Sequence, residues 1–160
     1  MTNFIRFLIN IFDFFTQKKI FDVIHKELGS KLPVFVDVGS HMGEYIIQLL
    51  KRFNVEKIYA FEPNPTIFKK LSKNVRNKRN IEIFDIGVGH LNEKKILHQN
   101  IESSSSSIYP LNINSKYYKK KFIVFNFLNL KKISKPIEID LIKLEDFLNN
   151  KKIIQVDLLK

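Results

Sequence analysis

Short continuous apolar runs alternate along this chain with segments in which apolar residues recur every three to four positions. Continuous runs of this length are typical of strands buried in a parallel sheet, and the longer spacing is typical of amphipathic helices. The alternation predicts strand, helix, strand, helix and strand at residues 34–38, 44–53, 57–61, 65–75 and 81–86. This β-α-β-α-β order predicts an α/β fold, a Rossmann-like parallel sheet with right-handed crossovers.

The pattern changes character after Gly87-Val88-Gly89, which we expect to close the third strand. Strand-like segments follow, and they predict a hairpin or a small antiparallel excursion. A short helix and a final buried strand complete the order: strands at 94–98, 122–128 and 137–142, helix at 144–148, strand at 153–159. That strand pattern runs to Lys160 with no closing turn. We therefore expect a chain truncated after the fourth main strand of its fold, because an apolar unpaired edge is avoided in folded proteins.

Residues 3–28 predict one or two helices, with a break near 17–19. Apolar residues at helical spacing make 4–15 an amphipathic helix, too short to cross a membrane and without the cleavage site of a signal peptide. We expect it to pack on a protein surface. Peripheral membrane contact is the less favoured alternative. The expected organisation is an N-terminal helical segment, 1–30, and a C-terminally incomplete domain, 31–160.

Composition fits one globular domain, since 44% of the 160 residues are hydrophobic and 15 are Phe. The absence of Cys excludes disulfides and thiolate metal sites and permits a reducing compartment, so we expect a cytoplasmic protein. The net charge of +11 raises nucleic-acid binding as an alternative. The lysines are spread along the chain and no nucleic-acid-reading motif accompanies them, so we expect no nucleic-acid partner.

The most informative stretch is the glycine turn that follows the first strand. That strand ends in Asp37, and Gly39 and Gly43 bracket Ser40 and His41 before the next helix. A dinucleotide fingerprint, G-x-G-x-x-G, needs a further glycine where Ser40 and His41 stand, so a pyrophosphate fits poorly. A nucleoside with an amino-acid tail, as in S-adenosylmethionine, needs a less close approach. We expect Asp37 to receive the ammonium of that tail, directly or through water, and Gly39 to leave room for it.

Acidic residues also end the second and third strands. Glu62 offers a carboxylate that accepts both hydroxyls of a ribose, which we favour over a simple helix-capping role. Asp85 is a candidate acceptor for the amine of the adenine, and Ile86 a candidate to stack on its ring. The expected cofactor-binding set is Asp37, Gly39, Ser40, Gly43, Glu62, Asp85 and Ile86.

At residues 33–160 the chain resembles the FkbM-type S-adenosylmethionine-dependent methyltransferases. The resemblance rests on the turn at 34–45, the Phe-Glu-Pro-Asn-Pro segment with its following helix, the glycine-bearing end of strand three, and 137–160 with its closing Asp-Leu-Leu-Lys. It implies a class I methyltransferase sheet and methyl transfer to an oxygen, often on a sugar or other small metabolite. The family tends to have Ala-Asn where this chain has Ser40-His41, and its motif continues beyond Lys160 into Ile-Asp-x-x-Gly. Lys160 matches the motif lysine, but its role stays unassigned. The catalytic residue is left unknown, with Lys160 only a weak candidate, because we expect the catalytic carboxylate to belong to the continuation of the motif beyond Lys160.

Several alternatives stay open at this point. One alternative is a cofactor-binding fragment without catalytic activity. A second is an NAD-dependent oxidoreductase, which the glycine spacing disfavours, and a third is a basic nucleic-acid binder. His41 titrates in the range of a general base but also suits a structural place in the turn. The serine run at 103–107 is a polar loop, or a loop that covers the cofactor. We expect no metal, since no His, Asp or Glu set has ligand spacing. The acceptor and the oligomeric state are left open.

Overall fold

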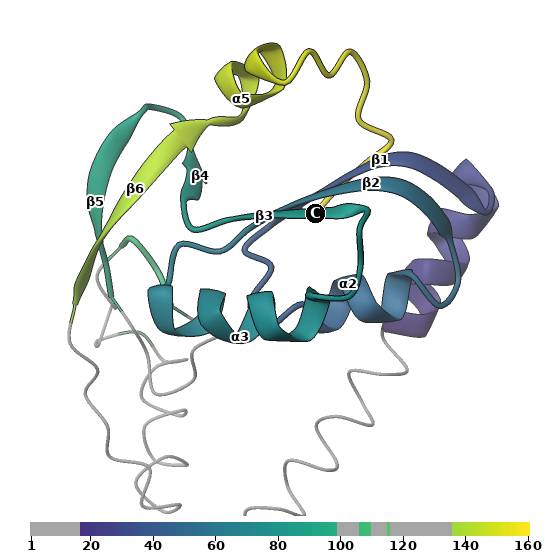
Figure 1. Ribbon diagram of the computed structural model, residues 1–160, viewed down its shortest axis with the longest axis horizontal. Coiled ribbons are helices and arrows are strands. Elements are labelled where there is room, and N and C mark those ends of the chain that lie inside the picture. Colours follow the sequence, from purple (N-terminus) through teal and green to yellow (C-terminus); the bar gives the residue numbers. More distant parts are fainter. Residues whose placement is uncertain (1–16, 99–105, 110–114, 116–135) are drawn as a thin grey trace, which may run out of the picture.

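Four parallel strands form the central sheet, in the order β3-β2-β1-β7 (Figure 1). The computed structural model describes residues 17–98, 106–109, 115 and 136–160. The strands are β1 (Lys31–Val38), β2 (Asn54–Phe61), β3 (Ile81–Phe84) and β7 (Leu158–Leu159). All three pairings are parallel, with β1 in register with β2 from Lys31↔Asn54 to Val38↔Phe61. The predicted α/β fold with a parallel sheet is confirmed.

Helices cover both faces of this sheet. The helix at 17–28, α2 (Glu44–Leu49) and α3 (Pro65–Val75) lie on one side, and α5 (Leu144–Asn150) lies on the other (Figure 1). Successive residues of β1 serve the two faces, because side chains alternate along a strand. Phe35 packs in the core with Phe21 and Ile46, whereas Val36 packs in a second core with Phe147.

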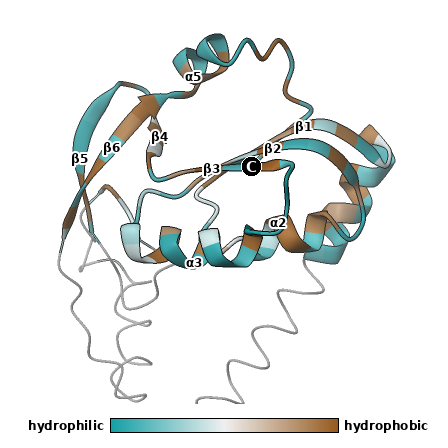
Figure 2. Ribbon diagram, in the orientation of Figure 1, coloured by the Kyte–Doolittle hydropathy of each residue, from teal (hydrophilic) through white to brown (hydrophobic). Residues whose placement is uncertain are grey.

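The helix α3 has the bounds that its sequence predicts. Asn64 caps its N-terminus by accepting hydrogen bonds from the backbone N–H groups of Thr66 and Ile67, and Pro65 occupies its first turn. Hydrophobic and hydrophilic residues alternate in bands along it (Figure 2), and its buried residues are Ile67, Leu71 and Val75.

The helix α2 ends at Leu49, before the predicted end at residue 53. The backbone N–H groups of Lys51 and Arg52 bond three residues back, to the carbonyls of Gln48 and Leu49. This tighter spacing closes the helix in a turn, which the apolar periodicity alone does not reveal.

A second, three-stranded sheet has the order β4-β6-β5: β4 (Gly87–Gly89), β6 (Ile137–Lys143) and β5 (Glu93–Leu97). Strands β5 and β6 are antiparallel, which agrees with the expected antiparallel excursion. The prediction that residues 87–89 only close the third strand is wrong, because they pair in parallel with β6. A Cβ at Gly87 would lie 2.5 Å from Cδ2 of Leu141 on that strand, so a side chain there would force the Leu141 side chain to shift. The predicted strand at 122–128 lies outside the described residues.

The predicted final strand at 153–159 is wrong over most of its length. Only Leu158 and Leu159 pair with β1, and Ile154 is fully exposed. Asp157 explains where pairing begins: its backbone N–H donates to the carbonyl of Val34, and its carboxylate accepts the N–H of Val34. The Asp157 side chain thus takes the place of a backbone acceptor for the N–H of Val34. The residues before Asp157 do not pair with β1.

The N-terminal prediction is tested only in its second half. Residues 17–28 form one helix, with no break at 18–19, while the amphipathic segment at 4–15 lies outside the described residues. Phe21 of this helix is buried in the same core as Phe35. The domain division at residue 30 stays a prediction. Within the described part of the chain, no helix combines the length and apolar character needed to cross a membrane.

Candidate functional site

Asp37, near the carboxyl end of β1, is fully buried, and its carboxylate has one ionic partner in the described structure. The ammonium of Lys160 donates to Oδ1 over 2.9 Å, from the end of β7. The other oxygen, Oδ2, is buried with no hydrogen-bond partner among the described residues. A buried carboxylate oxygen without a donor is costly, and such an atom marks a place where a ligand or water fits.

Burial and the Lys160 ammonium act in opposite directions on the pKa of this carboxyl. Desolvation raises the pKa of Asp37 above its ordinary 3.8, while the charge and hydrogen bond of Lys160, and then the Ser40 hydroxyl, oppose the rise. Tyr45 of α2 shares the surroundings: burial and the charge of Asp37 raise its pKa. The Lys160 ammonium lies 4.9 Å from the centre of the Tyr45 ring.

The turn after β1 is tied to the neighbouring strand by its own backbone. The N–H groups of Gly39 and Ser40 both donate to the carbonyl of Phe61, each over 2.9 Å. The Ser40 hydroxyl donates to the backbone carbonyl of Asp37. Gly39 and Ser40 therefore use their N–H groups to shape the turn, and what they leave for a ligand is space.

The two glycines of the turn serve different purposes. Both have positive φ, +75° at Gly39 and +84° at Gly43. A Cβ at Gly39 would meet nothing within 4 Å, whereas one at Gly43 would lie 2.9 Å from Cδ1 of Leu71. Gly43 thus lets α3 pack closely, and Gly39 leaves open space beside the carboxyl end of β1.

Glu62, one residue beyond β2, joins two turns. One carboxylate oxygen accepts the N–H of His41 and the other accepts the N–H of Asn64, both over 2.9 Å. Capping of α3 falls to Asn64 and not to Glu62. A carboxylate oxygen can accept more than one hydrogen bond, so both oxygens of Glu62 keep the capacity to accept another.

The predicted adenine residues follow β3 at the same edge of the sheet. The N–H of Glu62 donates to the carbonyl of Phe84, which brings the ends of β2 and β3 together. Asp85 is exposed. Ile86 is half-buried against the aromatic core that contains Phe147, on the face of the sheet that α5 covers. The structure therefore sets all the predicted binding residues along the carboxyl edge of three adjacent strands, β1, β2 and β3.

Sequence reasoning missed the partnership of Asp37 with Lys160. The two residues are 123 positions apart, and no local pattern links them. The Lys160 backbone bonds to β1 on both sides, N–H to the carbonyl of Val36 and carbonyl to the N–H of Val38, which places its side chain over Asp37. His41, the alternative base, has Nδ1 3.4 Å from the Glu44 carboxylate. Among the described residues no group of three His, Asp or Glu side chains suits a metal ion.

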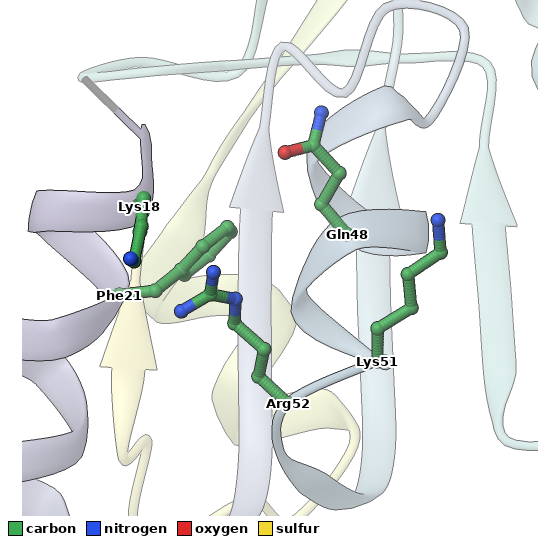
Figure 3. Close-up of a pocket in the computed structure, with 5 residues that line it drawn as sticks. All are labelled: Lys18, Phe21, Gln48, Lys51 and Arg52. Carbon is green, nitrogen blue, oxygen red and sulfur yellow. The ribbon is translucent and has the colours of Figure 1, made fainter. Parts of the chain in front are cut away.

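A pocket of about 280 Å³ lies elsewhere, between the helix at 17–28 and the C-terminal end of α2 (Figure 3). Lys18, Phe21, Gln48, Lys51 and Arg52 line it. The pocket lies along the flank of α2, between that helix and the helix at 17–28. None of the predicted site residues contributes to it.

Sequence comparison adds a family to this geometry. The family model of the methyltransferase FkbM domain matches residues 37–160, well over half of the chain. The matched range includes both residues of the Asp37–Lys160 ion pair. A search of curated protein sequences finds no match to this chain.

Solved structures show weaker likenesses. One is a methyltransferase FkbM from Methylobacillus flagellatus KT, with 13% identity, a TM-score of 0.39, and coverage of 73% of this chain and 23% of that one. Another is a precorrin 8W decarboxylase from Methanobacterium thermoautotrophicum, with 24% identity, a TM-score of 0.33, and coverage of 42% of this chain and 37% of that one. The chain thus spans well under half the length of either structure.

Proposed function

We propose, because this chain belongs to the FkbM methyltransferase domain family, that it binds S-adenosylmethionine and methylates a hydroxyl oxygen of a sugar or another small metabolite. The observation that carries the proposal is the pair of buried carboxylates, Asp37 and Glu62, at the ends of adjacent parallel strands with an open glycine turn between them. In open α/β sheets, ligands bind outside the carboxyl ends of the strands.

The residues at this edge fit the parts of that cofactor. Glu62 keeps acceptor capacity for the ribose hydroxyls. Asp37 carries a buried oxygen without a donor, which suits the ammonium of the amino-acid tail, reached through water because the side chain is fully buried. Gly39 and Ser40 give the tail room, Gly43 holds the turn against α3, and Asp85 and Ile86 flank the adenine.

When bound, the cofactor would supply a sulfonium methyl group: the acceptor oxygen would attack the methyl carbon in line with the C–S bond, the thioether would leave, and the hydroxyl proton would be lost. The protein contributes alignment of the reacting atoms, which supplies much of the rate in such displacements. The turn suits this task because its backbone is fixed on β2 and by Glu62 before any ligand arrives.

Calorimetry with S-adenosylmethionine and with S-adenosylhomocysteine tests the binding. We expect both to bind the wild-type protein and Glu62→Gln to weaken both, because an amide replaces one acceptor oxygen by a donor. Glu56→Gln is the matched control: Glu56 lies on the same strand but is exposed. Absence of heat with the wild-type protein, or equal affinity in the Glu62 variant, contradicts the proposal.

Turnover is measured separately, with a labelled methyl donor and a panel of sugars and small hydroxylated metabolites. Methyl transfer to one of them supports the enzymatic part of the proposal. Cofactor binding with no transfer to any acceptor favours a cofactor-binding chain without catalytic activity. We propose the cytoplasm as its compartment, because the chain has no Cys, and a small-molecule acceptor as its partner.

A further inference from the structure

Lys160 presents a cation at the carboxyl edge of the sheet. Its side chain is 39% exposed while that of Asp37 is fully buried, although their charged groups are 2.9 Å apart. A ligand arriving at this edge therefore meets the ammonium of Lys160 before it meets the carboxylate. The buried carboxylate holds that ammonium in place.

The strand order indicates which part of the proposed cofactor lies near Lys160. Strands β2 and β3 lie on one side of β1, and β7 lies on the other. The ribose acceptor, Glu62, follows β2, and the adenine candidates follow β3. A cofactor whose nucleoside lies over β2 and β3 extends its tail across Gly39 and β1 toward β7, the strand that Lys160 follows.

The tail and the ion pair have matching charges. The amino-acid tail carries an ammonium and a carboxylate on one carbon, and the site carries a carboxylate and an ammonium in contact. Hydrogen bonds between charged partners are stronger than neutral ones, and a carboxylate needs donors that Asp37 cannot supply. Gly39 and Ser40 donate their backbone N–H groups to Phe61, whereas the partly exposed ammonium of Lys160 offers a charged donor beside the tail.

We infer that Lys160, held by Asp37, binds the carboxylate of the cofactor's amino-acid tail and thereby selects cofactors that carry the complete amino acid. The inference rests on the proposed binding of S-adenosylmethionine. It gives Lys160 a role in binding and specificity, in place of the catalytic role considered from the sequence.

The test compares the binding of two ligands to the wild-type protein and to two variants of Lys160. S-adenosylhomocysteine has the complete tail, and its decarboxylated counterpart keeps the ammonium but lacks the carboxylate. We expect wild-type protein to prefer the complete tail by about ten- to a hundredfold in Kd, the range of a charged hydrogen bond. We expect Lys160→Met to bring this preference close to one, and Lys160→Arg to restore most of it.

The preference ratio separates this role from a merely structural one. A substitution that only disturbs the fold or the charge of Asp37 weakens both ligands alike and leaves the ratio unchanged, which would overturn the inference. Lys94→Met is the matched control, since Lys94 also pairs with a carboxylate over 2.9 Å, on β5; its ratio should equal that of the wild type. Equal binding of both ligands by the wild-type protein contradicts the role of Lys160 alone, whereas no binding of either contradicts the proposed function as well.

Discussion

Individual residues at the turn after β1 combine unusual backbone with close packing. Gly43 has φ of +84° and also lies where a Cβ would contact Leu71 of α3. Gly29 has φ of +76° but open space around it. Alanine substitutions at Gly43 and Gly29 therefore distinguish two contributions to the loss of stability: left-handed backbone strain, which both share, and crowding, which only Gly43 has.

We expect Gly43→Ala to lower the free energy of unfolding by about 2–5 kcal/mol, the sum of left-handed strain and overpacking. Gly29→Ala should cost about 1–2 kcal/mol, the strain alone. Urea unfolding followed by circular dichroism measures both. Equal decreases in the free energy of unfolding would show that Leu71 of α3 shifts to accommodate the new methyl group without loss of stability.

Asp37 predicts an unusual dependence of stability on pH. Burial raises its pKa in the folded protein, so the folded state holds the proton more tightly than the unfolded state does. As pH rises from 3.8 through the raised folded pKa, unfolding releases this proton, and the contribution of Asp37 to stability falls. Asp37→Asn removes that contribution. The difference in unfolding free energy, wild type minus variant, should decrease from acidic toward neutral pH in a series of urea titrations. A difference that rises with pH would mean that Lys160 outweighs burial.

At the scale of elements, α5 packs on the sheet through its buried residue Phe147, with Leu144 and Leu148 partly buried in the same core. The Phe147 ring meets Tyr59, Phe61 and Phe84 edge-on, with centroids 5.4, 4.9 and 5.0 Å away. Edge-to-face contacts of this kind add to the burial of apolar area. The helix itself has only seven residues, so packing and not helix propensity keeps it in place.

We expect Phe147→Ala to cost about 3–5 kcal/mol of unfolding free energy, the range for removing a buried Phe. Ile154→Ala, in the segment after α5 and fully exposed, should change it by less than about 0.5 kcal/mol. Thermal and urea unfolding of the two variants provide the comparison. A small effect at Phe147 would mean that the aromatic core repacks without it.

The sequence predicts correctly those elements whose determinants all lie within their own segment of the chain. The helix at 65–75 has its cap, its proline and its periodicity within its own sequence, and its bounds are confirmed. Strand β4 and the shortened β7 depend on partners about fifty and more than a hundred residues away, β6 and β1, and no local pattern announces such pairing. The same reason hid the contact of Asp37 with Lys160, although each residue was singled out separately.

For the whole molecule, the sheet predicts a gradient of local stability. Strands β1 and β2 pair over their full length at the centre, whereas β1 and β7 share only two register pairs. We expect the amides of β1 and β2 to exchange with solvent most slowly, close to the rate of global unfolding, and those of Leu159 and Lys160 to exchange faster. Hydrogen exchange followed by mass spectrometry measures this order. Equal protection of β7 and β1 would contradict it.

The hydrogen bonds that hold the turn after β1 also have a kinetic consequence. Glu62 and the carbonyl of Phe61 fix the turn in the free protein, so a ligand meets a surface that is already shaped. Association then needs no preceding rearrangement, which is what slows many binding reactions. In stopped-flow mixing, the observed rate should rise linearly with cofactor concentration, and a plateau would reveal an ordering step that the turn does not require.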